Sequence, residues 1–313
     1  MKQFVLASLF AGAVAVPAMA DYTIIAPANP GGGWDQTART MQTVMQEEGI
    51  SKSAQVQNVP GAGGTIGLAQ FASQNNGNPD ALIVGGYVMV GAILTNNSPV
   101  SLKDVTPIAR LTGEYEAIVV PAASSIQDIQ GLVEALKADP GAVSWAGGSA
   151  GGTDHIAVGL IAKAAGVDPT KINYIAYSGG GEALAAILGN QVTAGISSLG
   201  EFEAQIQAGT LRLLAVSSPE RLEGVDAPTL QEAGLDVTLE NWRMVAAAPG
   251  LSDEQKAKVT ADIEKMAKSE NWQKQLADKG WMDTWLAGPE FDAQLEKDIS
   301  ATEAILKDIG LVK

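Results

Sequence analysis

Short apolar segments alternate with segments of helical periodicity along most of the chain. In the first part, Thr23–Ala26, Gln55–Val59 and Ala81–Gly85 predict strands. Between them, the residues from Asp35 to Gly49 and Thr65–Ser73 carry apolar side chains at helical spacing. Ala81–Gly85 is wholly apolar, which is typical of strands buried on both faces of a parallel sheet. This alternation predicts an α/β fold.

A second round of the same alternation begins at Ser125. Ser125 and Asp128 are expected to form a capping pair for a helix that begins with Ile129. The other helices expected in this round are Ile156–Ala165 and Glu182–Leu188. The expected strands are Ala117–Val120, Val143–Ala146, Ile172–Ala176, Val192–Ser197, Leu211–Val216 and Asn241–Ala247, and Asn96–Pro99 and Lys103–Pro107 are expected to be turns.

The C-terminal part is expected to be helical. Ser252 with Gln255 has the pattern of a capping box, and Phe291–Thr302 carries apolar residues on one helix face. Two βα rounds and a helical tail predict two α/β lobes joined by two crossing segments, near Glu116–Val120 and Asn241–Val245. We therefore expect lobe 1 to comprise residues 21–117 and 243–313, with the tail packed on it, and lobe 2 to comprise residues 118–242.

The first twenty residues have the pattern of a secretory signal peptide. Lys2 precedes the apolar run Phe4–Val16, and Ala18–Ala20 forms an A-x-A cleavage site, so we expect cleavage after Ala20. The longest later apolar run, Ala81–Leu94, contains three glycines and is shorter than the roughly 20 residues of a spanning helix. The sequence therefore predicts an exported protein without a membrane span.

The chain is acidic and contains no cysteine. Its formal net charge is −15, from 20 basic and 35 acidic residues, which argues against binding to nucleic acid or to anionic membranes. A small anionic ligand is still compatible, because salt screens the bulk charge within about 8–10 Å. One histidine, no cysteine and scattered carboxylates predict no metal site, and no cofactor motif is present.

Three glycine-rich loops follow predicted strands. They lie at Pro30–Asp35, Asn58–Gly67 and Ala146–His155, and each leads into a predicted helix. Backbone N–H groups at such turns, together with the helix dipole, favour an anion. Because ligands of open α/β sheets lie at the carboxyl ends of strands, the three loops are expected to converge on one site for a small carboxylate.

The motifs P-G-G-x-x-D (residues 30–35), N-x-P-G-A-G-G-x-x-G (58–67) and S-A-G-G-T-D-H (149–155) occur in this order over the chain. In this order they resemble the substrate-binding receptors of the tripartite tricarboxylate transporter system, the Bug-type family of periplasmic binding proteins. The resemblance continues at Tyr177–Ala183, Leu211–Arg221 and Ala227–Gly234. The form Gly-Gly-Gly-Trp-Asp resembles the branch associated with citrate-like tricarboxylates.

This resemblance implies a two-lobed flytrap fold (type II) in the periplasm, a monomer and not an enzyme. It would close on an organic acid anion and deliver that acid to a membrane permease. The implied ligand contacts are Gly31, Gly32, Gly33, Trp34 and Asp35 in the first loop, Gly61, Ala62, Gly63, Gly64 and Thr65 in the second, Ser149, Gly151, Gly152, Thr153, Asp154 and His155 in the third, and Tyr177 and the Ser197–Ser198 pair at later strand ends.

Other candidates for the site come from the residues themselves. Tyr87 lies close to a predicted strand end and is a candidate contact, with plain core packing as the alternative. Among the arginines, Arg39 and Arg110 are expected at the surface. Arg243 lies at a predicted crossing segment, and two roles are open for it: a cation that binds the ligand, or a structural residue.

Two other classes of function, a serine hydrolase and a nucleotide-binding protein, are disfavoured by the sequence. Gly147–Gly151 matches G-x-S-x-G, which would make Ser149 the nucleophile of a serine hydrolase. The only histidine, His155, follows six residues later in what is expected to be the same helix, so a catalytic triad is disfavoured and a helix-start hydrogen bond is expected for it. The nucleotide-binding glycine motifs are not matched. A ligand-sensing role beside a sensor kinase remains open.

Overall fold

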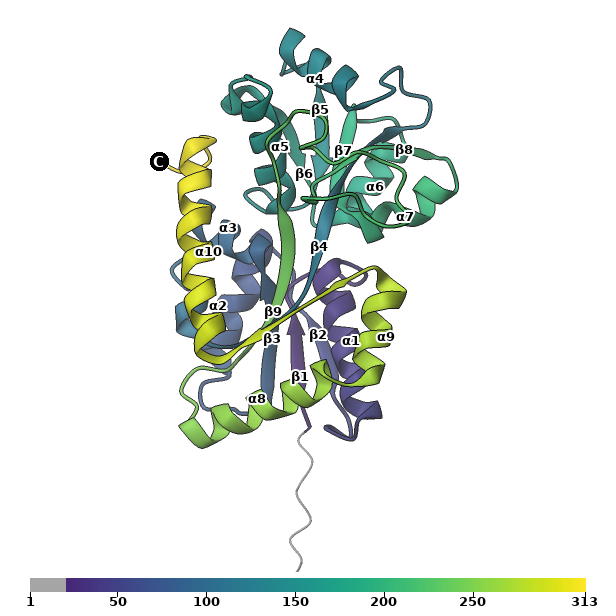
Figure 1. Ribbon diagram of the computed structural model, residues 1–313. Coiled ribbons are helices and arrows are strands. Elements are labelled where there is room, and N and C mark those ends of the chain that lie inside the picture. The colour runs from purple at the N-terminus through teal and green to yellow at the C-terminus, as the bar shows by residue number, and fades with distance from the viewer. Residues whose placement is uncertain (1–20) are drawn as a thin grey trace, which may run out of the picture.

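The computed structural model describes residues 21–313, so the expected signal peptide and its cleavage site lie outside the described residues. Two α/β lobes lie one above the other, and two long strands run between them (Figure 1). No helix within residues 21–313 is both long enough and apolar enough to cross a membrane.

The first lobe is built on six strands. Parallel β1 (Thr23–Ala26), β2 (Gln55–Asn58) and β3 (Ala81–Gly86) are continued by antiparallel β9 (Glu240–Ala247), β4 (Thr106–Pro121) and β10 (Met282–Ala287). Its helices are α1 (Gly33–Glu47), α2 (Thr65–Gln74), α3 (Tyr87–Thr95), α8 (Asp253–Ala267), α9 (Glu270–Lys279) and α10 (Gly288–Asp308), with α1 against α9 and α3 against α10 (Figure 1). The helical tail therefore packs on this lobe.

The second lobe uses the end of β4 and four further strands. These are β5 (Ser144–Gly147), β6 (Asn173–Ala176), β7 (Ala194–Ser198) and β8 (Leu211–Val216), with β7 and β8 antiparallel to β4. Helices α4 (Ile129–Ala138), α5 (Thr153–Ala164), α6 (Gly180–Leu188) and α7 (Leu199–Gln207) surround them. Short 3₁₀ turns η1 (Ala62–Gly64), η2 (Leu102–Asp104) and η3 (Pro169–Lys171) complete the elements.

Strand β4 belongs to both lobes. Its residues up to Tyr115 pair with β9, and from Glu116 onward they pair with β7 and β8. A single 16-residue strand therefore crosses from one half of the molecule to the other.

A second contact between the halves comes from the last turn of the chain. Lys163 of α5 is ion-paired with Asp308 of α10, and a Cβ on Gly159 would lie 2.8 Å from the side chain of Ile309. The last helix thus touches the second lobe although its length packs on the first.

Most of the helices and strands predicted from the hydrophobic pattern are present in the structure. All six residues of β3 are buried, as the apolar run predicted, and the Ser252–Gln255 capping box is present at the start of α8. The predicted Ser125–Asp128 capping pair is wrong, because Asp128 alone is the N-cap of α4 and accepts a hydrogen bond from the Gly131 N–H.

Four elements were not predicted, and one predicted turn is partly strand. Helix α3 is apolar on nearly every face, and the sequence shows it only as an apolar run. Helices α7 and α9 are short, at 9 and 10 residues, and only one residue of α7 and two of α9 are buried. Strand β10 has no buried residue. Thr106 and Pro107 lie in β4 rather than in a turn, since β10 and β9 pair with that end of the strand.

Candidate ligand-binding cleft

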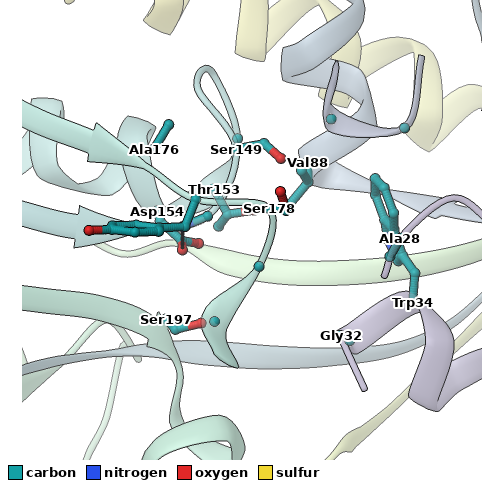
Figure 2. A pocket seen from close by; sticks show the side chains of 18 of the residues that line it. Ala28, Gly32, Trp34, Val88, Ser149, Thr153, Asp154, Ala176, Ser178 and Ser197 are labelled. Atoms are coloured by element: carbon teal, nitrogen blue, oxygen red, sulfur yellow. Dashed lines mark hydrogen bonds between the residues drawn. The ribbon is translucent and has the colours of Figure 1, made fainter. Parts of the chain in front are cut away.

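A cavity of about 380 Å³ lies between the lobes and is lined by residues of both. Its walls come from the segments that follow β1, β2, β3, β5, β6 and β7 (Figure 2). Trp34 and Ala28 of the first lobe face Ser149, Thr153 and Ser197 of the second. The three glycine loops therefore do converge on one cavity.

The first loop presents the start of α1. Gly32, the N-cap, uses no side chain to cap the helix, so the N–H groups of Gly33 and Trp34 carry no intrahelical bond. Gly31 and Asp35 do not line the cavity. The carboxylate of Asp35 accepts bonds from the Gly31 N–H at 2.8 Å and from Asn58 at 2.8 Å, and it pairs with Arg39. Burial raises the pKa of Asp35, but these hydrogen bonds outweigh it and lower the pKa overall.

The second loop lines the cavity with residues 60–64. The segment has a run of positive φ angles, and at Gly64 a Cβ would lie 2.6 Å from the Trp34 ring, so only glycine fits there. Thr65 does not reach the cavity, because its hydroxyl donates to the Ala62 carbonyl at 2.9 Å. The loop therefore offers backbone groups, not the hydroxyl that the sequence suggested.

The third loop is fastened to α5 behind it. Asp154 accepts the Gly148 N–H at 2.6 Å, His155 Nδ1 accepts the Gly151 N–H at 3.1 Å, and the Ser149 carbonyl accepts the Gly152 N–H at 2.9 Å. Ser149, Gly152, Thr153 and Asp154 line the cavity, whereas Gly151 and His155 do not.

Gly151 and His155 serve the loop's support. Gly151 has φ +75°, and a Cβ there would lie 2.4 Å from Thr95 Oγ1 of α3, so the loop lies against the other lobe. The His155 ring stacks on Tyr174 with centroids 4.2 Å apart, and burial lowers the pKa of His155 to about 4. The imidazole is therefore neutral, and the expected helix-start hydrogen bond is present.

Later strand ends supply the rest of the second lobe's wall. Tyr177 lies in the lining after β6, and Ser178 follows it, with its N–H donating to Glu182 at 3.1 Å. Gly179 is the N-cap of α6, again without a side-chain cap. Ser197 at the end of β7 donates its hydroxyl to Glu201. Tyr87 is not in the lining: it is buried at the start of α3, edge-on to Trp242 at 6.2 Å.

Sequence analysis missed part of this lining. Val88 and Asn96 belong to or follow the unpredicted helix α3, Glu201 lies on the unpredicted α7, and Asn241 belongs to β9. Arg243 of β9, which the sequence left open between a ligand cation and a structural role, also lines the cavity. The Tyr177–Ala183 motif contained the signal for Ser178, Gly179, Gly180 and Glu182. The remaining unpredicted lining residues are Pro27, Ala28, Pro60, Gly148, Ala150 and Ala176, whereas both members of the predicted Ser197–Ser198 pair line the cavity.

Acidic side chains gather at and below the cavity. Arg243 is 3% exposed and pairs with Glu114, whose pKa burial raises against the lowering effect of that arginine. Both carboxyl oxygens of Glu116 lack a hydrogen-bond partner within residues 21–313, and burial followed by the charge of Asp154 raises its pKa well above the ordinary value. Burial also raises the pKa of Asp154 to about 7. These carboxyl groups therefore keep their protons to higher pH than exposed carboxyl groups do.

Ser149 has no catalytic partner within the described part of the chain. No hydrogen bond joins it to His155, whose Nδ1 is occupied by the Gly151 N–H and whose ring is stacked on Tyr174. The G-x-S-x-G match thus forms a loop that lines a cavity and lacks the serine–histidine bond of a hydrolase.

The family is decided by a match over nearly the whole chain. The model of the "Tripartite tricarboxylate transporter family receptor" matches residues 37–311. The chain belongs to this receptor family. Receptors of the family are solute-binding proteins of the periplasm, and the predicted membership is confirmed. Protein BugT of Bordetella pertussis is 29% identical over 248 residues, which cover 76% of this chain and 75% of BugT.

Solved structures agree on the fold of this receptor. MatC of Rhodopseudomonas palustris with bound malate superposes with a TM-score of 0.80 at 24% identity, covering 91% of this chain and 98% of MatC. A second R. palustris protein, with adipate, has a TM-score of 0.83 at 21% identity and covers 93% and 97%. At these identities the likeness shows the fold alone. The receptor has the two-lobed fold of periplasmic binding proteins, as predicted.

Proposed function

We propose that this receptor captures a small di- or tricarboxylate, citrate-like in size and charge, in the cavity between its lobes. The observation that carries the proposal is the convergence of three helix N-termini, those of α1, α5 and α6, on the cavity. Each begins after a glycine N-cap without a side-chain cap, so each directs backbone N–H groups and a positive dipole end at the space between them.

The size of the cavity and the relatives support the same ligand class. A volume of about 380 Å³ falls within the range of small-molecule sites. The malate and adipate held by two proteins of the same fold are both dicarboxylates. Each charge-assisted bond to a carboxylate contributes roughly 1.5–3 kcal/mol, so a few at each end would offset the cost of closing the lobes.

The closing movement would use the two segments that join the lobes. The division into residues 21–117 plus 243–313 and residues 118–242 is part of this proposal, with the pivot where β4 changes partners between Tyr115 and Glu116. The ligand contacts proposed are the predicted residues that line the cavity: Gly32, Gly33, Trp34, Gly61, Ala62, Gly63, Gly64, Ser149, Gly152, Thr153, Asp154, Tyr177 and Ser197.

The further steps follow from the transport system of the family. The exported receptor, cleaved after Ala20, would carry its ligand as a monomer through the periplasm to the permease subunits. Docking on a sensor kinase is the second candidate role for the same closed form, and a permease and a sensor would both read the ligand-bound arrangement of the lobes.

A thermal-shift panel tests the proposal. The exported protein is unfolded, dialysed and refolded to remove any ligand carried through purification, then screened against citrate, isocitrate, tricarballylate, malate, succinate, glutamate and an aromatic acid. A ligand at about a thousand times its Kd adds roughly 4 kcal/mol, which raises Tm by several degrees for a chain of this size. A shift with di- or tricarboxylates is expected, and its absence for every acid would refute the proposed function.

A further inference from the structure

A buried hydroxyl of the cleft donates its hydrogen bond to the protein. Ser197 lies at the end of β7, is 4% exposed and lines the cavity. Its hydroxyl donates to Oε2 of Glu201, one turn into α7. The Ser197 oxygen therefore meets the cavity with lone pairs, and the Glu201 carboxylate beside it can only accept when ionised.

Thr153 repeats this arrangement. Its side chain is fully buried, and its hydroxyl donates to Asn241 Oδ1 at 3.2 Å. Asn241 Nδ2 donates in turn to Ser198 Oγ at 3.1 Å. The bonds run from the cavity lining into the strand behind it, so the hydroxyl of Thr153 also donates within the protein and not to the ligand.

The other polar groups around the cavity are mostly donors. They include the uncapped N–H groups of Gly33 and Trp34, those at the start of α6, and the hydroxyl of Ser149, for which no acceptor is found within residues 21–313. The guanidinium of Arg243 also lines the cavity, and its Nη1 has no hydrogen-bond partner within the same residues. Figure 2 shows Ser149 and Ser178 across from Val88 and Trp34, apart from Ser197. The cavity thus has several donors and one acceptor side, which is formed by the Ser197–Glu201 pair beside Gly180 at the start of α6.

A ligand that carries only ionised carboxylates cannot satisfy the acceptor side. Carboxylate oxygens accept and do not donate, so an unsubstituted chain acid would leave the lone pairs of Ser197 and Glu201 unmatched. Buried acceptors without a donor are costly, and a carboxylate placed against Glu201 would add repulsion.

We propose that the ligand carries a hydroxyl or ammonium group beside its carboxylate, and that this group donates to the Ser197–Glu201 pair. Glu201 then becomes the residue that selects hydroxylated or aminated acids over plain ones. This inference rests on the proposed function, since it assumes that an organic acid fills the cavity.

Matched pairs of acids test the ligand half of the proposal by calorimetry on refolded protein. Malate and aspartate each differ from succinate by one donor group, and citrate differs from tricarballylate by one hydroxyl. A hydrogen bond to a charged acceptor predicts that the donor-bearing member binds about 10- to 150-fold more tightly. Malate against aspartate then identifies the donor as hydroxyl or ammonium.

Two variants test the residue assignment. Glu201→Gln keeps the shape of the side chain and removes the charged acceptor, so the ratio of affinities within a matched pair should fall at least about fivefold. Glu203→Gln, an exposed side chain of the same helix outside the cavity lining, removes the same formal charge and should leave the ratio unchanged. Because the readout is a ratio, a general gain in anion affinity does not affect it.

The outcomes separate the two proposals. Equal binding of succinate, malate and aspartate, and of tricarballylate and citrate, overturns the inference while the carboxylate receptor stands. Full discrimination retained in Glu201→Gln overturns the role of Glu201. Absence of binding by every acid refutes the proposed function and this inference with it.

Discussion

Neutralising Asp154 should change how the stability of the protein depends on pH. The side chain is 6% exposed, and burial together with the charge of Glu201 raises its pKa from the ordinary 3.8 to about 7. Between these two values the folded protein binds a proton that the unfolded chain releases. The free energy of unfolding therefore falls as pH rises from about 4 to about 7, by about 1.4 kcal/mol per pH unit and about 4 kcal/mol in all.

Asp154→Asn removes this loss because the amide stays uncharged at every pH. Its Oδ1 can still accept the Gly148 N–H, which the carboxylate accepts at 2.6 Å. The two proteins should be equally stable near pH 4, and the variant should be more stable by up to about 4 kcal/mol at pH 8, which is on the order of 10 °C in Tm. Urea unfolding of ligand-free protein at each pH unit from 4 to 8 measures the difference.

Asp168→Asn provides a control of opposite sign. Hydrogen bonds from the Thr170 hydroxyl and N–H lower the pKa of Asp168, so its contribution to stability is present above the unfolded pKa and is lost as pH falls. That variant should lose stability relative to the natural protein at neutral pH and not at low pH. A difference curve for Asp154→Asn that is flat from pH 4 to 8 would refute the reasoning.

Three further results are expected. An anionic ligand beside Asp154 should raise the pKa of that carboxyl further, so ligand binding should take up protons at pH 7. Calorimetry in buffers of different ionisation enthalpy measures this uptake, and a binding enthalpy that does not depend on the buffer contradicts it. Gly151→Val should press against Thr95 from a positive φ and weaken acid binding at least about tenfold by calorimetry, whereas Gly181→Ala, which meets open space, should bind normally. Asp35→Ala should lower stability by about 1–3 kcal/mol in urea unfolding, because it removes the acceptor of two part-buried hydrogen bonds, those from the Gly31 N–H and from Asn58. A loss below about 0.5 kcal/mol, the size of a neutral surface change, argues against this role.

Much of the fold was readable from the sequence because short segments rich in apolar residues alternate with segments of helical periodicity. Thr23–Ala26 and Leu211–Val216 have the predicted bounds, and the capping box at Ser252 marks the start of α8. Helix α3 was not predicted, because a helix that is apolar on nearly every face has no polar side and therefore no helical period in its hydrophobicity. For the same reason its first residue, Tyr87, was placed close to a predicted strand end.

The sequence predicted which loops form the cleft better than it predicted which side chains line it. The glycine loops after strands located the cleft, because their backbone conformation is determined by the local sequence. Which side chains turn inward depends on the partner that each one finds in the fold: Asp35 faces Arg39 and Asn58, and Thr65 donates to the Ala62 carbonyl of its own loop. Glu201 lies on helix α7, which was not predicted, so the acceptor side of the cavity could not be predicted from the sequence.

The last turn of α10 gives the molecule a third point of support between its halves. The 21-residue helix, about 30 Å long, is held along its length by the first lobe, and its end rests on α5 through Ile309 and the Lys163–Asp308 pair. The two strands that join the lobes are continuous backbone, whereas the contact at the end of α10 is made by side chains, so a wide rotation of the lobes would have to release it. The pair is half exposed and weak, so this end is the support that gives way at least cost. A purification tag fused after Lys313 would sit beside this joint, and the position of a fusion partner should therefore shift ligand affinity without touching the cavity.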